Sequence, residues 1–103
     1  MHIPVARPGI DMRIALVAMG QMEKDFGGKR FALDFPDGST LANLLRRIGD
    51  DFADVMSEAL WNRAECRFRG PVVMMTGGAA LRDPATVLRE GQEILVYKVF
   101  VGG

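Results

Sequence analysis

The chain closes with Gly102 and Gly103, and the group there that can form a new covalent bond is the carboxylate of Gly103. Glycine lacks a Cβ atom, so a Gly-Gly end is slim enough to enter a narrow channel in another protein. A carboxylate is a poor acyl donor at neutral pH, and its transfer to a nucleophile requires conversion to a mixed anhydride. Ordering such a tail costs about 1 to 2 kcal/mol per residue. We expect Val99, Phe100 and Val101 to offset this cost by apolar contacts with a partner.

The remaining residues offer no catalytic centre for that activation. The sequence has no glycine-rich phosphate loop ending in lysine, no acidic cluster spaced for a metal, and no nucleophile-base triad. We therefore expect the chain to be no enzyme and to bind no cofactor or metal of its own. Activation of the tail would then fall to a separate protein.

The composition predicts a single domain. A chain of 103 residues, 49% hydrophobic and 25% charged, suffices for one core and is too short for two ordinary domains. Thirteen basic and thirteen acidic side chains cancel, which argues against nucleic acid or a membrane surface as a partner. The lone Cys66 cannot form an internal disulfide, no apolar run approaches the roughly 20 residues of a membrane span, and Met1 to Asp11 lacks the centre of a signal peptide. We expect a cytoplasmic protein.

Several other residues could carry chemistry, but each has a structural explanation that we favour. A lone cysteine is more often inert than reactive, and clustered arginines are more often solvated at a helix end than a site for an acidic partner. Strand methionines favour core packing over a binding patch, a glycine pair without a following helix favours a turn over an anion site, and a histidine near the terminus favours solvation. The residues are Cys66; Arg63, Arg67 and Arg69; Met74 and Met75; Gly77 and Gly78; and His2.

The N-terminal part predicts a leader followed by two strands. Two prolines and a glycine interrupt any regular pattern, so we assign residues 1–12 to a leader and residues 13–103 to one domain with a C-terminal Gly-Gly tail. The run from Arg13 to Met19 is short and apolar, which favours a central strand covered on both faces. After a polar link, Phe31 to Phe35 alternates large apolar side chains with smaller or polar ones and predicts a hairpin partner for that strand.

The middle of the chain predicts helices. Ser39 and Thr40 suit a helix start, and Gly49 suits a left-handed stop. Between them, apolar residues follow the i, i+3, i+4, i+7 spacing: Leu41, Leu44, Leu45 and Ile48. A second helical pattern begins at Asp50 or Asp51 and aligns Phe52, Val55, Met56, Ala59 and Leu60. The pattern alone leaves open whether one helix runs through Gly49.

The C-terminal part predicts further strands and turns. We expect a third strand at Val72 to Thr76 and a turn at Gly77-Gly78 that leads into a short returning strand, Ala79 to Arg82. We then expect an apolar anchor at Val87 with Leu88, a second turn at Gly91-Gln92 and a final strand from Glu93 to Val101. A mixed sheet with the helix across one face buries all the apolar stripes. If the first and last strands pair in parallel, the helical region is the crossover between them. This arrangement is an α+β, β-grasp fold with four to five strands, one main helix and a second helical segment.

Three segments resemble the MoaD/ThiS family of ubiquitin-like sulfur carriers. They are Phe35-Pro36-Asp37-Gly38-Ser39-Thr40-Leu41 with Leu44-Leu45, Val72 to Gly78, and Leu88 to Ile94 running into Val99-Phe100-Val101-Gly102-Gly103. The resemblance implies a β-grasp fold and adenylation of the Gly103 carboxylate by a partner enzyme that uses ATP and Mg. It also implies replacement of the adenylate by sulfur to give a thiocarboxylate, with Gly102 allowing access.

The same resemblance implies the partners. They are an adenylating activating enzyme, a sulfur donor and, in one pathway, the larger subunit of molybdopterin synthase. Molybdopterin and thiamin-type pathways both stay open, and the length of the chain favours the first. Two other functions also stay open: a ubiquitin-like modifier conjugated to target lysines through Gly103, and a non-covalent interaction domain that uses the sheet or the arginine cluster.

Overall fold

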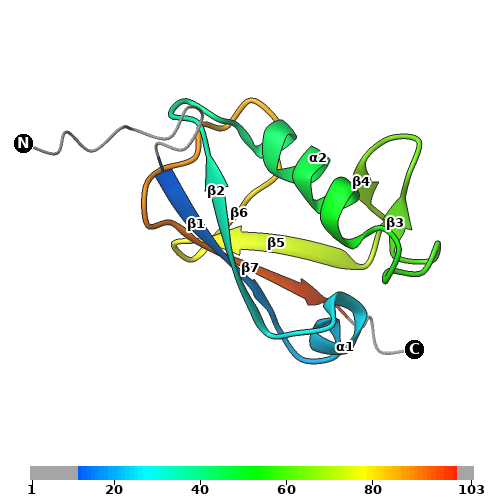
Figure 1. The fold of residues 1–103 in the computed structure, drawn as a ribbon. Coiled ribbons are helices and arrows are strands. Elements are labelled where there is room, and N and C mark those ends of the chain that lie inside the picture. Colours follow the sequence, from blue (N-terminus) through cyan, green and yellow to red (C-terminus); the bar gives the residue numbers. More distant parts are fainter. Residues whose placement is uncertain (1–11, 100–103) are drawn as a thin grey trace, which may run out of the picture.

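The computed structural model describes residues 12–99, which form a mixed sheet, two helices on one face of it and a small hairpin (Figure 1). The five-stranded sheet has the order β2-β1-β7-β5-β6, and β3 pairs with β4. The elements are β1 (Met12–Ala18), α1 (Met22–Phe26), β2 (Arg30–Phe35), α2 (Leu41–Phe52), β3 (Trp61–Asn62), β4 (Arg67–Phe68), β5 (Val72–Thr76), β6 (Ala79–Ala80) and β7 (Glu93–Lys98). Residues 1–11 and 100–103 lie outside the described residues. The α+β, β-grasp prediction is confirmed.

The central strands are those predicted from the apolar runs. β1 pairs antiparallel with β2 and parallel with β7, so α2 lies in the crossover as expected. The inner residues of the two central strands are fully buried: Ile14, Leu16, Ile94 and Val96. β1 begins at Met12, one residue before the predicted domain start, because the Met12 side chain is buried and pairs with Phe35.

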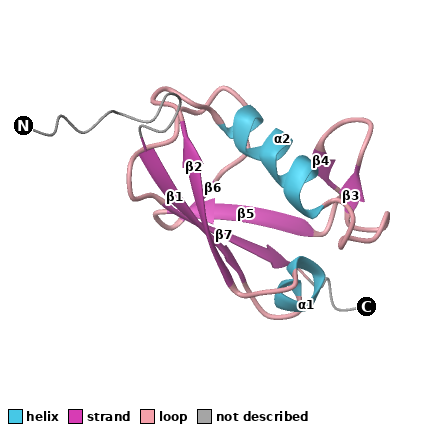
Figure 2. Ribbon diagram, viewed as in Figure 1, coloured by secondary structure: helices cyan, strands magenta, loops and turns pink. Residues whose placement is uncertain are grey.

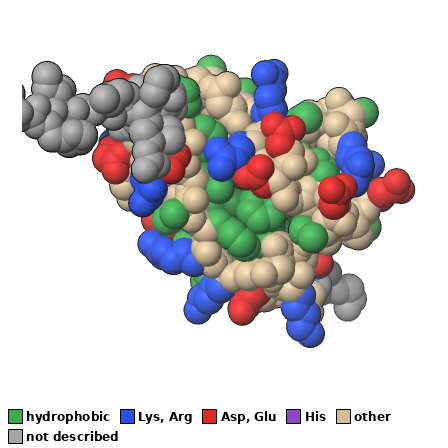
Figure 3. All heavy atoms as spheres, in the orientation of Figure 1, with side chains coloured by type: hydrophobic (Ala, Val, Ile, Leu, Met, Phe, Trp, Pro, Cys, Tyr) green, Lys and Arg blue, Asp and Glu red, His purple; other side chains and the backbone are tan. Residues whose placement is uncertain are grey.

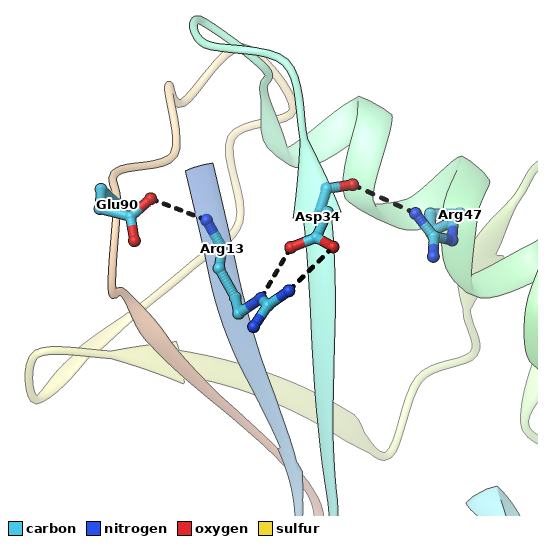
Figure 4. A network of polar contacts seen from close by, with 4 residues as sticks. All are labelled: Arg13, Asp34, Arg47 and Glu90. Atoms are coloured by element: carbon cyan, nitrogen blue, oxygen red, sulfur yellow. Dashed lines mark hydrogen bonds and ion pairs between the residues drawn. The ribbon is translucent and has the colours of Figure 1, made fainter. Parts of the chain in front are cut away.

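A polar network fixes the register of the first hairpin (Figure 4). Arg13 stands opposite Asp34, and its Nε donates a 2.8 Å hydrogen bond to Asp34 Oδ1. The Arg13 backbone N–H donates to Glu90, and Arg47 of α2 donates to the Asp34 carbonyl oxygen. The hydrogen bond to Asp34 raises the pKa of Arg13 above its ordinary value, so this residue stays charged. The network joins β1, β2, α2 and the turn before β7, and it covers part of the free edge of β2.

The main helix starts where predicted but runs past the expected stop. Thr40 is the N-cap, and its N–H donates a 2.8 Å hydrogen bond to Asn43 Oδ1. Four residues at helical spacing face the sheet and are buried: Leu41, Leu44, Ile48 and Phe52. The helix continues through Gly49 to Phe52. Gly49 serves close packing instead of ending the helix, since a Cβ atom there would lie 3.2 Å from Trp61 Cζ2.

The second helical pattern, predicted from Asp50 onward, is wrong as a separate helix. Past Phe52 the chain forms turns in which Met56 and Leu60 are buried, whereas Val55 and Ala59 are exposed. Apolar residues at helical spacing predict a helix, but this spacing does not predict where the chain must turn back so that the following residues pack on the core.

The second helix is α1, inside the segment predicted to be a polar link. Met22 and Phe26 lie one turn apart and are both buried. Gly27 ends the helix with a φ of 76°, and its N–H donates back to the helix carbonyls. Phe26 packs edge-to-face on Phe52, with ring centroids 4.9 Å apart. The five-residue helix therefore closes one end of the core.

The polar stretch after α2 contains the β3–β4 hairpin (Figure 2). Trp61 pairs with Phe68 across it, and their rings meet edge-to-face at 4.9 Å. The arginine cluster, predicted at a helix end, lies on and beside this hairpin: Arg63, Arg67 and Arg69. Two residues per strand are too short for an alternation signal, so sequence reasoning missed the hairpin.

The last strands follow the prediction closely. β5 and β6 join through Gly77 and Gly78, whose φ angles are 57° and 80°. Met74 is buried in the core as predicted, whereas Met75 is half-buried outside the core cluster, so the core prediction is confirmed for Met74 only. The apolar anchor is Leu88, since Val87 is 57% exposed. The described part of the final strand ends at Lys98, and Val99 lies just beyond it. Phe100 and Val101, which the prediction included in this strand, lie outside the described residues.

The core reaches the surface between β2 and α2. Phe31 is half-buried, and its ring packs edge-to-face on Phe52 at 4.8 Å. Figure 3 shows hydrophobic side chains gathered between these two elements, with charged side chains around them. This exposed strip is continuous with the main core cluster and is not a separate cavity.

Candidate functional site: the root of the tail and the outer sheet face

The predicted tail follows β7 in the sequence. Gly102 and Gly103 lie outside the described residues, as do Phe100 and Val101. Val99 is described, and it is 43% exposed. Its backbone N–H donates a 2.7 Å hydrogen bond to the carbonyl oxygen of Pro71. The last described residue is therefore tied to the sheet while its side chain reaches solvent.

The strand before the tail is held on both sides. β7 lies between β1 and β5, and Met19 of the β1 end donates its N–H to the Val96 carbonyl at 2.9 Å. Lys98 Nζ lies 3.1 Å from Asp25 Oδ2 of α1, and both side chains are largely buried. The Asp25 oxygen makes no aligned hydrogen bond among the described residues, so the contact is a charge pair. Together these contacts fix where a tail can begin.

The sheet face opposite the two helices carries an apolar stripe that leads to this root. We call it the outer stripe; its residues are Val17, Val73, Met75, Leu95 and Tyr97. In the sheet register Leu95 lies between Val17 and Met75, and Tyr97 lies beside Val73. Val17 is buried and the other four are half-buried. The outer stripe is thus a flat apolar surface on β1, β7 and β5.

A hollow lies beside the end of the outer stripe. Its volume is about 340 Å³, and it is lined by Leu95, Tyr97 and Lys98 of β7 together with Met19, Gly20 and Gln21. Met19 is 40% exposed there. A hollow of this size holds one or two side chains of a partner, which suits an anchoring contact near a tail.

The charged groups near the sheet position strands and do not form a reactive centre. Arg30 Nη1 and Glu93 Oε2 form an exposed 2.9 Å pair between β2 and β7. Such a surface pair is worth about 0 to 1 kcal/mol. Within residues 12–99 there is no group of three His, Cys, Asp or Glu side chains able to hold a metal ion. The arrangement can present a tail and a docking face.

Sequence reasoning predicted a tail, whose glycines lie outside the described residues, and missed the apolar surface that leads to the end of β7. The predicted partner contacts were Val99, Phe100 and Val101, and of these the described part of the chain contains Val99. The outer stripe was detectable, because in β7 the apolar residues Leu95 and Tyr97 alternate with the core residues Ile94 and Val96. An apolar run on both faces of a strand signals either a covered second face or a binding face. The contribution of Asp25 carried no sequence signal.

Neither helix in residues 12–99 has the length and apolar character needed to span a membrane.

The comparisons with known proteins concern the fold. No protein-family model matches the chain, and no curated protein matches it.

Solved structures do match. SAMP1 from Haloferax volcanii superposes with a TM-score of 0.72 at 11% identity, covering 88% of this chain and 99% of its own. A putative molybdopterin converting factor subunit 1 from Pyrococcus furiosus gives 0.68 at 12% identity, covering 87% and 100%. Urm1 from Trypanosoma brucei gives 0.64 at 16% identity, covering 88% and 95%.

These likenesses establish the class of fold. The chain has the ubiquitin-like β-grasp, and the match spans nearly all of each neighbour. The resemblance to ubiquitin-like carriers that the sequence suggested is therefore confirmed for the fold. At identities of 11 to 16%, these neighbours show the fold of the chain and not its function.

Proposed function

We propose that this protein is a sulfur carrier that works through the carboxylate of Gly103. A partner activating enzyme adenylates this carboxylate, and sulfur then replaces the adenylate to give a thiocarboxylate. Gly102 and Gly103 enter the active site of that enzyme, while the outer stripe and Val99 to Val101 contact its surface. The chain contributes no catalytic residue, and ATP and Mg are bound by the partner.

The two steps balance without an additional oxidant or reductant. A Gly103 carboxylate oxygen attacks the α-phosphorus of ATP, and the bond to pyrophosphate breaks. A sulfide from the sulfur donor then attacks the acyl carbon, and AMP leaves with the oxygen that joined it to the tail. Positioning and neutralisation of phosphate charge dominate the first step, and both are tasks of the activating enzyme.

One observation carries this proposal: the predicted tail follows directly from the central strand of a ubiquitin-like sheet. Val99 is exposed immediately after β7, and the Lys98–Asp25 and Val99–Pro71 contacts hold its root. A tail rooted in a rigid strand starts from a defined point, which lowers the ordering cost of docking to the residues beyond it. The outer stripe supplies apolar surface that continues to the same point.

The experiment is to incubate the full chain with activating enzymes of the MoaD/ThiS type, ATP, Mg and sulfide, and to follow its intact mass. The expected result is a mass increase equal to the exchange of one oxygen for sulfur, located by fragmentation at Gly103. The control is the chain lacking Gly102 and Gly103, which should stay unmodified. Absence of both AMP release and the mass change with every activating enzyme of the host would contradict the proposal.

A protein modifier is the second candidate. One neighbour type is named a small archaeal modifier protein, and it shares this fold at a TM-score of 0.71. In that function the activated Gly103 is joined to lysines of target proteins. A ladder of higher-mass conjugates in the host that requires both glycines would favour the modifier. A thiocarboxylate without conjugates would favour the carrier.

The sulfur carried by Gly103 has a proposed destination in molybdopterin synthesis. The neighbour from Pyrococcus furiosus is named a putative molybdopterin converting factor subunit 1, and it matches over its whole length. The expected partner is the larger subunit of molybdopterin synthase, and a thiamin-type pathway is the alternative. Binding of the thiocarboxylate form to a purified larger subunit of the host separates the two.

A further inference from the structure

A groove lies on the helix side of the molecule and meets the outer stripe at Val73, which lines both. We call it the side groove. Leu45 of α2, Val72 of β5 and Leu81 form its floor, Phe68 of β4 forms a wall, and Arg67 and Arg82 stand at the rim. Leu81 is buried, whereas Leu45, Phe68 and Val72 are half-buried. The groove exists because the β3–β4 hairpin stands beside α2 without closing against the edge of β5.

The size of the side groove indicates what it can hold. Its volume is about 260 Å³. Cofactor-sized ligands occupy pockets of about 300 to 1,000 Å³. A pair of aliphatic side chains fits the smaller volume and would remove the half-exposed apolar floor from water.

The charge at the rim is positive. Arg82 forms no ion pair with any residue in the 12–99 range. The neighbouring Asp83 accepts a hydrogen bond from the Ala85 N–H. Arg67 contacts Glu65 at 3.2 Å, and both side chains are more than half exposed. An exposed pair of this kind exchanges partners at little cost. Two guanidinium groups at the rim of an apolar groove therefore suit carboxylates on either side of an aliphatic pair.

Residues 12–99 of a second copy do not supply this occupant. In that range the exposed large aliphatic residue next to an acidic side chain is Val55, beside Asp54. One valine buries far less than the roughly 1,200 Å² of a stable protein interface. An extended segment with two adjacent aliphatic residues matches the groove better.

We propose that the side groove binds a short segment of a partner protein in which two aliphatic residues are flanked by acidic ones. The aliphatic side chains occupy the floor over Leu45 and Leu81, and the acidic side chains pair with Arg67 and Arg82. Gly70 lines the groove and Pro71 holds Val99, so the bound segment lies next to the root of the tail. Met75 and Leu95, at the centre of the outer stripe, do not line the groove and stay free for a different partner. This binding is independent of the chemistry at Gly103.

The test is selection of peptides from a displayed random library against the full chain, followed by fluorescence polarisation with the strongest peptide. The expected peptides contain an aliphatic pair between acidic residues. The R67E/R82E double variant should bind roughly tenfold more weakly, because attraction becomes repulsion. Amide shifts in NMR spectra should change at Leu45, Phe68 and Leu81.

Three controls make the result decisive. Arg63→Glu changes a charge on the same hairpin outside the groove, Leu95→Asp disturbs the outer stripe, and the chain lacking Gly102 and Gly103 removes the tail; all three should bind the peptide normally. Thermal melting verifies that each variant is folded. Peptides without acidic residues, equal binding by R67E/R82E, or shifts confined to Leu95 and Tyr97 would each overturn the proposal. Loss of sulfur loading with retained peptide binding would refute the carrier function alone.

Discussion

Two of the Gly-Gly pairs in this chain, Gly77-Gly78 and Gly102-Gly103, require glycine for different reasons. Gly77-Gly78 forms the turn between β5 and β6, with φ angles of 57° and 80°, and no atom lies within 4 Å of a Cβ added at either residue. Glycine is therefore required there by the left-handed backbone conformation, and not by a lack of space for a side chain. Gly102-Gly103 is proposed to need glycine for the opposite reason, because a side chain would obstruct a channel in the partner. A matched exchange to alanine separates the two requirements.

The largest effect is expected from replacing Gly102-Gly103 with Ala-Ala. The added methyl groups displace the carboxylate in the activating enzyme, and loading should fall by about a hundredfold, as for other misplacements of a reacting group. Adenylation measured by pyrophosphate release reports the loss, and the free energy of unfolding should be unchanged. Normal loading of this variant would show that loading does not require the absence of side chains at these two positions.

The same exchange at Gly77-Gly78 should act on stability instead. Alanine in a left-handed conformation costs about 1 to 2 kcal/mol per residue, so the free energy of unfolding should fall by about 2 to 4 kcal/mol. Denaturant unfolding measures it. Loading per folded molecule should equal that of the unchanged chain. A loading defect in fully folded protein would mean that this turn also contacts the activating enzyme.

A smaller effect is expected from a substitution in the outer stripe, the apolar surface of the sheet that leads to the root of the tail. Leu95→Asp should raise the KM for the activating enzyme by about tenfold and leave kcat unchanged, because it removes binding that is equal in the ground and transition states. The matched control is Leu45→Asp, a half-buried leucine on the other side of the molecule. Steady-state kinetics distinguish them, and an equal KM for both variants would remove the outer stripe from the docking surface.

The smallest effect concerns the pair that ties the tail root to α1. A double-mutant cycle of Lys98→Met and Asp25→Asn should give a coupling energy of about 1 kcal/mol in urea unfolding. Amide hydrogens of α1 should exchange faster in either single variant, since the pair links α1 to β7. A coupling energy of zero would leave the Val99–Pro71 hydrogen bond as the contact that fixes the root.

Periodicity recovered the elements that are long enough to show it. The apolar run of β1, the alternation at Phe31 to Phe35 and the helical spacing from Leu41 each span several repeats, and all three elements formed where expected. It failed for α1 and for the β3–β4 hairpin, where a five-residue helix and two-residue strands give no repeat to detect. It also predicted helix beyond Phe52, because Val55 and Ala59 match a helical face without being buried.

The sequence by itself determined the β-grasp order of strands and helix and placed the glycines whose carboxylate we propose as the site. These properties follow from local patterns of apolar residues and from which residues tolerate unusual backbone angles. Tertiary structure decided what surrounds them. Asp25 meets Lys98 across 73 positions, and Phe68 meets Leu45 beside β5, only because the chain folds back. Such contacts depend on how elements pack, and no short window of sequence contains both partners.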